Sequence, residues 1–430
     1  MTKIIKKKKF KPIGIIIILV LISLIVVTCI TYKNKTNEEK LKLQEKLKQE
    51  ENAKLLKEIE NNYSKYVITI NDSIIYKKIN NDYDKIGEIY KDTIIELEEK
   101  EITLEDKYFK ITSLDEEYYI NYKDVNKSEQ QEKDKRYLKY IKLDKEIITK
   151  EKTNLYFNDK KVYTLNKSMT FPIYKIDKDK YYVQYDNNLM YILKDDIKEE
   201  KEVKNTEEYA KEIPVIVYHF FYDPEVGEEC NQIICHSKQQ LTSHIEYIKT
   251  NDFFTPTMKE FELFMEGNIR LPKKSVMITI DDGYLSKIGV DLLTENKLNA
   301  TLFLITGSYD PKWHDSDYVE LHSHTHNLHK TGQCPGGQGG GLKCLSKEII
   351  ANDLKKSSEM LNNTTALCYP FYEFTEHTIS VMKEVGYTMG FAGSGAGGSY
   401  KARIGGDKYR IPRHTLNKNS TVNDLKKIIG

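Results

Sequence analysis

The feature that most restricts how this chain can fold is an uncharged apolar run, Ile13–Ile30, near its N-terminus. The run is long enough to cross the hydrocarbon core of a bilayer as one helix. The basic tail over residues 1–12 predicts that the N-terminus stays in the cytoplasm. A cleaved signal peptide is the alternative, but no small-x-small cleavage site follows the run. We therefore expect an uncleaved, single-pass membrane anchor over residues 13–32, with the rest of the chain outside the cell.

Length and charge narrow the class of protein further. The chain has 430 residues, which is enough for two or three domains. Its 66 Lys and Arg residues balance 65 Asp and Glu residues. There is thus no overall basic field of the kind that attracts nucleic acid. We therefore expect no nucleic-acid partner. The anchor predicts that the protein is attached to a membrane.

Four of the six cysteines fall in two loops of the C-terminal half. Cys230 and Cys235 share one loop, and Cys334 and Cys344 bracket a Gly-rich one. An extracellular location permits disulfides, so we expect staples within or between these pairs, with a second metal site as the alternative. The Gly-rich loop lacks the ending of a phosphate-binding loop, and we interpret it as a flap. Cys368 lies in a strand-like run, where a buried small apolar residue is expected.

The middle of the chain predicts a stalk followed by two small β modules. The Lys/Glu-rich stretch after the anchor has helical periodicity and is expected to be a solvated helical stalk. Two regions of short β-branched and Tyr-rich runs follow, and each ends in a similar motif, Tyr119–Val125 and Tyr191–Ile197. This rhythm of strands and turns is typical of small all-β barrels. The predicted boundaries are 33–62 for the stalk, 63–127 and 150–199 for the modules, and 200–212 for a charged linker.

The two modules resemble tandem bacterial SH3-like domains, which commonly bind cell-wall material. The resemblance rests on the strand rhythm and on the shared closing motif. The alternative is that the modules only pack together and hold the following domain away from the membrane.

From residue 213 onward, strands alternate with helices. This alternation predicts a parallel α/β barrel over residues 213–430. Active sites of such barrels lie at the C-terminal ends of the strands. The predicted strands are Pro214–His219, Ser275–Ile280, Ala300–Ile305, Ala366–Tyr369 and Thr388–Phe391, and the predicted helices are 237–250, Leu285–Asn296, 346–361 and Glu376–Val385.

Two adjacent carboxylates, Asp281 and Asp282, end one of these buried strands and precede Gly283. Like charges in a poorly hydrated site repel each other, and a cation would remove that cost. A cluster of four histidines follows about forty residues later, between His322 and His329. Asp and His together suit a borderline divalent metal such as zinc. A strand-ending turn without a metal is the alternative for the Asp pair alone, but the pair and the cluster together indicate a hydrolytic metal site.

Several motifs in this region resemble those of the polysaccharide deacetylases, the NodB-homology group of carbohydrate esterase family four. The resemblance covers about residues 213–430, half of the chain. It implies a distorted (β/α) barrel that hydrolyses an N-acetyl group on an amino sugar to give acetate and a free amine. The motifs are Thr279–Gly283, Pro214–His219, Leu271–Val276, Ala300–Leu304 and Tyr369–Phe371 followed by Val385–Tyr387.

The resemblance also implies roles for individual residues. Asp281 would be the general base that takes a proton from the attacking water, and Asp282 would be a metal ligand. Two registers fit the histidine cluster. We prefer His324 and His329 as the other ligands, and the pair His322 and His326 is the alternative. Zinc is the expected metal, with cobalt or another transition metal as alternatives.

Other groups of the site follow less directly from the resemblance. Tyr369 and Pro370 are expected beside the substrate, with the Tyr369 N–H stabilising the tetrahedral oxyanion. The Arg that usually precedes this Pro and orients the catalytic Asp is missing, because Leu367–Tyr369 stands in its place. His414 is the expected general acid, and a surface His is the alternative. His219 could instead contribute a proton or shape the pocket.

These observations predict a membrane-anchored, extracellular, metal-dependent deacetylase of cell-wall glycan. Peptidoglycan N-acetylglucosamine is the favoured substrate, because the anchor, the stalk and the β modules would hold the enzyme in the wall. The expected consequence is resistance to lysozyme-type hydrolases. The alternatives are a deacetylase of exported poly-N-acetylglucosamine and a catalytically weakened wall-binding protein, which the missing Arg would suit.

Overall fold

The computed structural model describes residues 12–430, apart from residues 64, 81, 98–101, 104–106, 114–115, 129–135 and 187. Residues 1–11 of the predicted cytoplasmic tail lie outside the described residues. The chain divides into two compact units, Met1–Gln131 and Glu132–Gly430, and each is described by itself.

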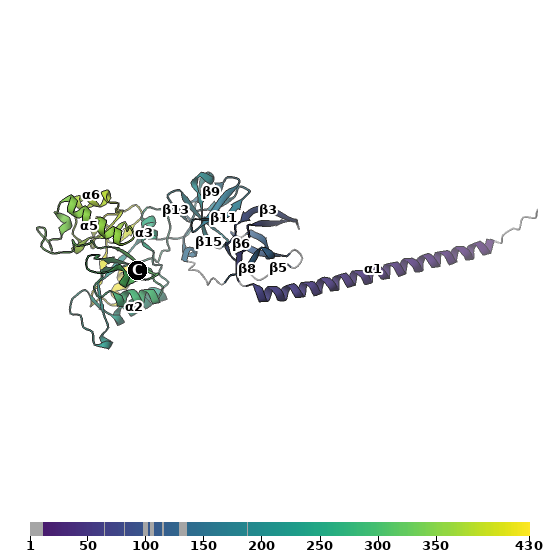
Figure 1. The fold of residues 1–430 in the computed structure, drawn as a ribbon, viewed down its shortest axis with the longest axis horizontal. Coiled ribbons are helices and arrows are strands. Elements are labelled where there is room, and N and C mark those ends of the chain that lie inside the picture. The colour runs from purple at the N-terminus through teal and green to yellow at the C-terminus, as the bar shows by residue number, and fades with distance from the viewer. Residues whose placement is uncertain are drawn as a thin grey trace, which may run out of the picture. The chain divides into compact units, whose positions relative to one another are not determined.

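The first unit begins with one long helix, α1 (Pro12–Asn62), drawn as a single coiled ribbon in Figure 1. The apolar side chains from Ile16 to Ile30 are exposed, whereas Leu55 and Ile59 near the end of the helix are buried. By length and composition the helix is apolar enough to cross a membrane, although a signal sequence would pass the same test. The predicted anchor and stalk thus form one continuous helix.

The two predicted β modules have the same strand order. In the first module β1 pairs with β4 and β8, and the other strands follow the order β3-β2-β7-β6-β5. In the second module β9 pairs with β12 and β16, and the corresponding strands follow the order β11-β10-β15-β14-β13. The shared order indicates an internal repeat, and the SH3-like assignment stays a prediction. The strands are β1 (Tyr66–Thr69), β2 (Ser73–Ile79), β3 (Asp82–Ile89), β4 (Ile94–Glu96), β5 (Ile102–Thr103), β6 (Tyr108–Ser113), β7 (Glu116–Asn121), β8 (Val125–Lys127), β9 (Lys145–Thr149), β10 (Thr153–Phe157), β11 (Lys160–Leu165), β12 (Thr170–Pro172), β13 (Lys175–Asp177), β14 (Lys180–Tyr185), β15 (Asn188–Leu193) and β16 (Ile197–Glu202).

The remainder of the second unit is built on a seven-stranded parallel sheet with the order β25-β24-β23-β22-β21-β18-β27. The sheet is curled, because its last segment reaches both edges. Ile411 bridges to Phe391 of β25, and His414 pairs with Ile216 of β18. The predicted α/β alternation is therefore confirmed in a curled sheet. The strands are β18 (Val215–Tyr218), β21 (Met277–Asp282), β22 (Ala300–Leu304), β23 (Val319–Ser323), β24 (Ala366–Cys368), β25 (Met389–Phe391) and β27 (His414–Thr415), and short pairs are formed by β17 (Glu212–Ile213) with β26 (Ala402–Arg403) and by β19 (Phe220–Tyr222) with β20 (Cys235–Ser237).

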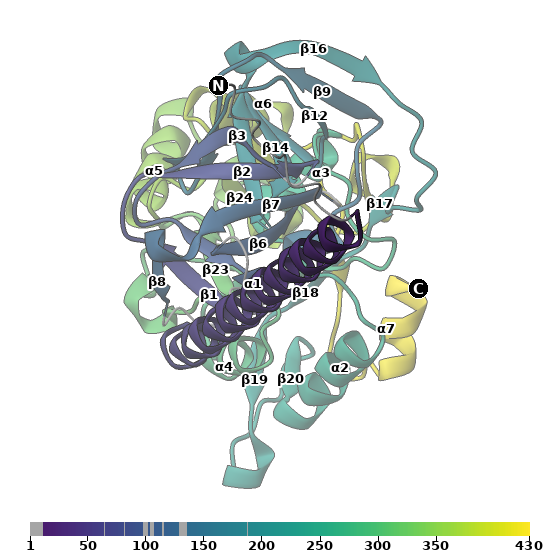
Figure 2. The same ribbon diagram turned by 90° about the vertical axis from the view of Figure 1, so that its right-hand side faces the viewer.

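Helices cover the convex face of this sheet. One apolar cluster joins α2, α4 and α7 to the strands, and another joins α5 and α6 to β24. Figure 2 shows α2 beside α7, in agreement with their contacts. Side-chain caps fix where several helices begin, for example Ser237 before α2 and Ser346 before α5. The helices are α2 (Lys238–Thr250), α3 (Met258–Met265), α4 (Lys287–Glu295), α5 (Lys347–Met360), α6 (Glu376–Glu384) and α7 (Val422–Ile429).

Alternation along each strand decides which side chains face the interior of the curl. Met277, Phe303 and Cys368 belong to an interior cluster closed at one end by α3, whereas Ile278 and Ile280 pack under the outer helices. Successive side chains of a strand point to opposite faces. Asp281, which is two residues beyond Thr279 and four beyond Met277, therefore points inward.

The second β module is tied to the sheet domain within the same unit. Ile141 and Lys175 form isolated bridges with Arg270 and Ile269. The Arg270 guanidinium also pairs with the Asp144 carboxylate, and this holds the pKa of Asp144 at about 2. The module and the sheet domain are thus joined by both backbone and side-chain contacts.

Candidate active site

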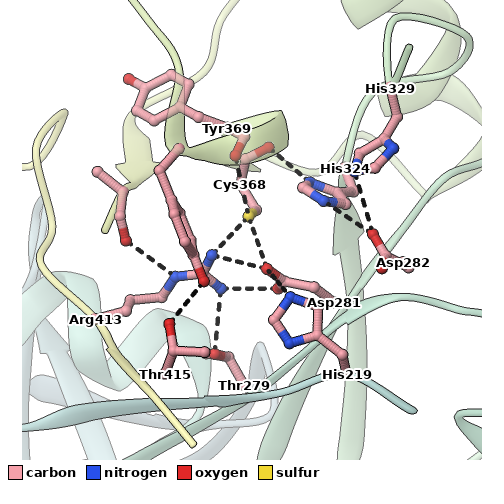
Figure 3. A network of polar contacts seen from close by, with 12 residues as sticks. His219, Thr279, Asp281, Asp282, His324, His329, Cys368, Tyr369, Arg413 and Thr415 are labelled. Carbon is pink, nitrogen blue, oxygen red and sulfur yellow. Dashed lines mark hydrogen bonds and ion pairs between the residues drawn. The ribbon is translucent and has the colours of Figure 1, made fainter. Parts of the chain in front are cut away.

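The two adjacent carboxylates at the end of β21 face different partners (Figure 3). Asp281 is still part of the regular strand, but Asp282 has a φ of 76° and Gly283 a φ of 97°. A Cβ on Gly283 would lie 2.5 Å from the Leu304 side chain, so only glycine fits this turn. The turn aims the Asp282 side chain away from that of Asp281. Its left-handed backbone is uncommon outside glycine and is found at functional sites.

Asp281 is held in a buried ion pair with Arg413. Arg413 Nη1 donates to Oδ1 at 2.7 Å and Nη2 donates to Oδ2 at 2.8 Å. The two side chains are 0% and 2% exposed. Burial alone would raise the pKa of Asp281, but the charge of Arg413 and its hydrogen bonds hold that pKa well below its usual value. Asp281 is therefore an ionised carboxylate in a site closed to bulk water.

The thiol of Cys368 completes this buried group. Its Sγ lies 3.3 Å from Asp281 Oδ2 and 2.9 Å from Arg413 Nη2. Burial raises the pKa of the Cys368 thiol, so it stays protonated and donates to the carboxylate. Cys368 is buried, as its strand-like context predicted, but it also has a polar contact with Asp281.

Asp282 faces the histidine cluster on the other side. Its Oδ1 lies 3.3 Å from Nε2 of His324 and 3.3 Å from Nε2 of His329. His324 Nδ1 is hydrogen-bonded to the carbonyl of Cys368 at 2.9 Å, which turns Nε2 toward Asp282. Burial and the charge of His324 lower the pKa of His329 to about 4, so its ring is neutral near pH 7.

One ligand atom from each of Asp282, His324 and His329 lies within 4.8 Å of the others. Two imidazole nitrogens and one carboxylate oxygen form a donor set that divalent zinc and similar metals accept, with a coordination position left for another ligand. The carbonyl that orients His324 is the kind of outer partner that metal-binding histidines have. The three residues therefore fit a divalent metal ion.

The alternative register of the cluster is not brought to Asp282. His322 is hydrogen-bonded through Nδ1 to Thr364 Oγ1 at 2.5 Å, and burial lowers its pKa to about 4. His326 Nδ1 is hydrogen-bonded to Thr306 Oγ1 at 3.1 Å. Each of these rings thus has a hydroxyl partner of its own, while His324 and His329 converge on Asp282.

His219 lies on the Asp281 side of the site. Its Nε2 is 3.9 Å from Asp281 Oδ2, and its buried Nδ1 has no hydrogen-bond partner within the described part of the chain. Burial lowers the pKa of His219, although Asp281 and Asp282 counteract this. His219 follows β18, the neighbour of β21 in the sheet, which brings it to the same edge as the Asp pair.

The roles that the sequence predicted for Tyr369 and for His414 need correction. The Tyr369 N–H donates to the Phe391 carbonyl at 3.0 Å and is not free to bind an oxyanion. Because Tyr369 follows the inward-facing Cys368, its side chain points away from the interior of the curl. The ring stacks on Phe374, and the hydroxyl donates to the Tyr409 carbonyl. Pro370 is buried in the turn that comes next.

His414 follows the inward-facing Arg413, so its side chain points to the other face of the extended segment. Its Nε2 is hydrogen-bonded to the Tyr400 carbonyl at 2.7 Å. This contact holds His414 against Tyr400, and it is His219 rather than His414 that lies beside Asp281.

Both predicted loop staples form as disulfides, Cys230–Cys235 and Cys334–Cys344. Pairing within each loop is thus confirmed, and pairing between the loops and the second metal site are not found for these four residues.

Sequence reasoning missed Arg413, although it lies beside the His that was considered. The Arg expected before Pro370 is absent from Leu367–Tyr369, and the guanidinium comes instead from the segment that closes the sheet. A signal was available: Asp281 was expected to be buried, and a buried carboxylate needs a positive partner. Arg413 lies in a short extended run with Ile411 and Pro412, where a cation has no other evident role.

Comparisons with known proteins agree with this geometry. Residues 268–390 match the family model described as polysaccharide deacetylase. A Bacillus subtilis (strain 168) protein named "Putative polysaccharide deacetylase YxkH" is 26% identical over 197 residues, which are 43% of this chain and 65% of that relative. The chain therefore spans slightly less than two thirds of the relative's length.

Two solved structures are similar to about half of this chain. A de-N-acetylase from Aggregatibacter actinomycetemcomitans has a TM-score of 0.44 at 20% identity, over 50% of this chain and 99% of that one. The Streptococcus pyogenes deacetylase PplD in complex with acetate has a TM-score of 0.41 at 18% identity, over 51% and 98% of the two chains. The matched family model places a similarity to polysaccharide deacetylases in the C-terminal part of this chain, and the curated relative agrees with it.

Proposed function

We propose that this protein is a metal-dependent N-deacetylase of an extracellular glycan. The observation that carries the proposal is the division of the Asp pair. Asp281 is an ionised carboxylate paired with Arg413, and Asp282 shares its Oδ1 with the Nε2 atoms of two histidines. Hydrolysis of an amide needs both a base and an electrophilic centre, and the two neighbouring residues would supply one each.

The residues that would hold the metal are Asp282, His324 and His329. A divalent ion bound there, most simply zinc, would polarise the acetyl carbonyl and lower the pKa of the attacking water. The protein's own contribution begins with Asp281. Its Oδ2 accepts from Arg413 and Cys368, whereas Oδ1 accepts from Arg413 alone in this group. A carboxylate oxygen has two lone pairs, so Oδ1 is the atom that would take the proton from water.

The leaving amine needs a proton, and His219 is the group that we propose to deliver it. Its ring lies within 3.9 Å of Asp281 at the same edge of the sheet. Because burial lowers the pKa of His219, its protonated ring would be a stronger acid than an exposed imidazolium. Asp281 and His219 are close enough to exchange a proton through the substrate or one water, so the proton removed from water could return to the amine.

Peptidoglycan N-acetylglucosamine is the substrate that we propose first. The apolar part of α1 would anchor the chain in the cell membrane with the N-terminus in the cytoplasm, and the β modules would lie in the wall with the catalytic domain. Deacetylation would leave free amines on the wall and make it a poorer substrate for lysozyme-type hydrolases. Exported poly-N-acetylglucosamine is the second candidate, because the preferred histidine register and the entry strand Pro214–His219 resemble those of the deacetylases that act on that polymer. The buried Arg413–Asp281 pair removes the observation that favoured a catalytically weakened wall-binding protein.

The test is acetate release by the detergent-solubilised full chain from peptidoglycan fragments and from poly-N-acetylglucosamine oligomers, each with added zinc or cobalt. Preference for wall fragments supports the first substrate, and preference for the oligomers supports the second. Release from neither, by a folded protein that binds the metal, would sink the enzyme proposal. His219→Gln should lower release strongly, and His414→Gln, its matched control on the outer face, should not.

A further inference from the structure

His329 is the least supported of the three proposed metal ligands. His324 is oriented by the carbonyl of Cys368, whereas the described residues offer His329 no side-chain polar partner apart from Asp282. Its ring instead packs against two others. The centroid of His324 lies 4.7 Å away and that of Phe371 lies 4.6 Å away. Phe371 is therefore the contact outside the ligand set that fixes the His329 ring.

Phe371 reaches His329 from a strained turn. Phe371 has a φ of 57° and Tyr372 a φ of 60°. Two consecutive left-handed residues with large side chains cost of order 1–3 kcal/mol each and persist only where the surroundings impose them. One end of the turn is fixed by Tyr369, which stacks on Phe374 with a centroid distance of 4.3 Å.

Glu373 fixes the other end of the turn. Its carboxylate accepts from the backbone N–H of Gln338 at 2.6 Å and of Gly340 at 2.7 Å, and it pairs with Lys343 Nζ at 3.1 Å. The Glu373 side chain is only 13% exposed. A Cβ on Gly337 would lie 1.8 Å from Glu373 Oε1, so the loop and the carboxylate are in close contact.

The loop that binds Glu373 is closed by a disulfide and packs against the sheet domain. The Cys334–Cys344 disulfide joins its ends. Leu342 is 1% exposed inside an apolar cluster of the sheet domain, and its carbonyl accepts from Thr378 Oγ1 at 2.6 Å. Lys343 Nζ donates back to the Gly336 carbonyl at 2.5 Å. The Gly-rich loop that the sequence predicted as a flap is thus closed by a disulfide and held by contacts of Leu342, Lys343 and Glu373.

We propose that this loop, residues 333–344, is a positioning element for the metal site. The loop binds the Glu373 carboxylate, and Glu373 in turn stabilises the strained turn. The turn places Phe371 against the His329 ring, which keeps its Nε2 directed at the position shared with Asp282 and His324. The inference rests on the proposed function, since it concerns how the proposed ligand set is preorganised. Glu373 and Phe371 are positioning residues and touch neither substrate nor metal.

The test is the zinc affinity of the metal-free full chain in detergent, measured by competition with a chelating dye. Glu373→Ala should weaken zinc binding about tenfold, the lower end of what the loss of an outer partner of a metal ligand causes. Phe371→Leu should weaken it similarly. The two changes together should cost no more than one alone, because both act through the same ring contact. Glu384→Ala, which breaks an exposed ion pair with Lys347, is the matched control and should leave the affinity unchanged.

A merely structural role for Glu373 would lower the melting temperature without this pattern. Wild-type zinc affinity in Glu373→Ala, or additive losses in the double variant, would overturn the proposal. If Glu373→Ala does not fold, Gly337→Ala displaces the same carboxylate through its new Cβ and should give the same loss, and wild-type affinity there would also overturn it. Failure of the proposed metal site would look different, because wild type and Asp282→Asn would then bind zinc equally.

Discussion

The two sides of the Asp pair differ in whether the protein alone supplies every group of the site. On the arginine side, the Asp281 carboxylate is neutralised by Arg413 and also accepts from Cys368, and the group is buried. On the histidine side, Asp282 meets two imidazole nitrogens at 3.3 Å, and its own side chain is 13% exposed. The first side is completed by groups of the protein, whereas the donor atoms of the second converge on a position that a metal ion would fill.

This difference shows how two chemically identical neighbours can have separate roles. The regular strand directs Asp281 to the interior, and one left-handed residue then directs Asp282 to the rim. A carboxylate that is paired but not coordinated stays ionised and able to accept a proton. Substitutions that remove one side at a time should therefore separate metal binding from proton transfer.

The largest effect is expected on the histidine side. Asp282→Asn removes the only carboxylate of the proposed ligand set, so zinc affinity should fall by more than about 100-fold, beyond what outer partners cause. Deacetylase activity should fall to background at zinc concentrations that saturate wild type. Dye competition and acetate release measure the two effects, and a variant that binds zinc normally would refute the assignment of Asp282.

Asp281→Asn should break the arginine side while the histidine side stays intact. The amide cannot act as a base at neutral pH, so turnover should fall by about 10²–10⁴-fold. Zinc affinity should stay at the wild-type value, since Asp281 is paired with Arg413 and not with the ligand histidines. Parallel losses of metal and activity would mean that the two carboxylates do not divide their roles.

Arg413→Met should destabilise the fold by about 3–5 kcal/mol at neutral pH, because it leaves a buried carboxylate without its partner. In the native chain the lowered pKa of Asp281 gives stability that is present above the ordinary carboxyl pKa and is lost as pH falls through the lowered value. In the variant, burial raises that pKa, so the carboxyl becomes neutral more readily. The destabilisation should therefore shrink as pH falls. Denaturant unfolding at several pH values measures it, and a constant difference would contradict the ion-pair assignment.

The smallest effect is expected from the unused histidine register. His322→Gln should leave zinc affinity unchanged, because its ring is hydrogen-bonded to Thr364 and not directed at Asp282. Stability should fall by only about 1 kcal/mol, the usual net value of one hydrogen bond. Loss of zinc in this variant, with binding retained in His324→Gln, would show that the register is His322 and His326.

The sequence predicted much of this site because its signals are local. Asp281, Asp282 and the histidine cluster lie in short motifs, and alternating strands and helices predicted the parallel sheet. The shared closing motif of the two β modules likewise predicted a repeat, and their strand orders are identical. In each case the relevant residues are neighbours in sequence or follow one period.

The parts that were not predicted depend on contacts between distant segments. Arg413 reaches Asp281 across 132 positions, and no local pattern announces that the closing segment of the curl supplies the cation. The Tyr369 N–H was assigned wrongly for the same reason, because its pairing with β25 decides that it is unavailable. The contacts that hold residues 333–344 likewise come from Glu373, which lies about thirty residues away.

The closing segment has a consequence for the order in which the sheet domain folds. Asp281 is synthesised well before its counter-ion, and until Arg413 arrives the carboxylate has to stay hydrated, since burying it alone would be very unfavourable. The interior of the curl can therefore exclude water only after Arg413 has been synthesised and has paired with Asp281. A chain that ends before Arg413 would have Asp281 exposed to water and its sheet open. Closure of the proposed active site would thus be a late event in the folding of this domain.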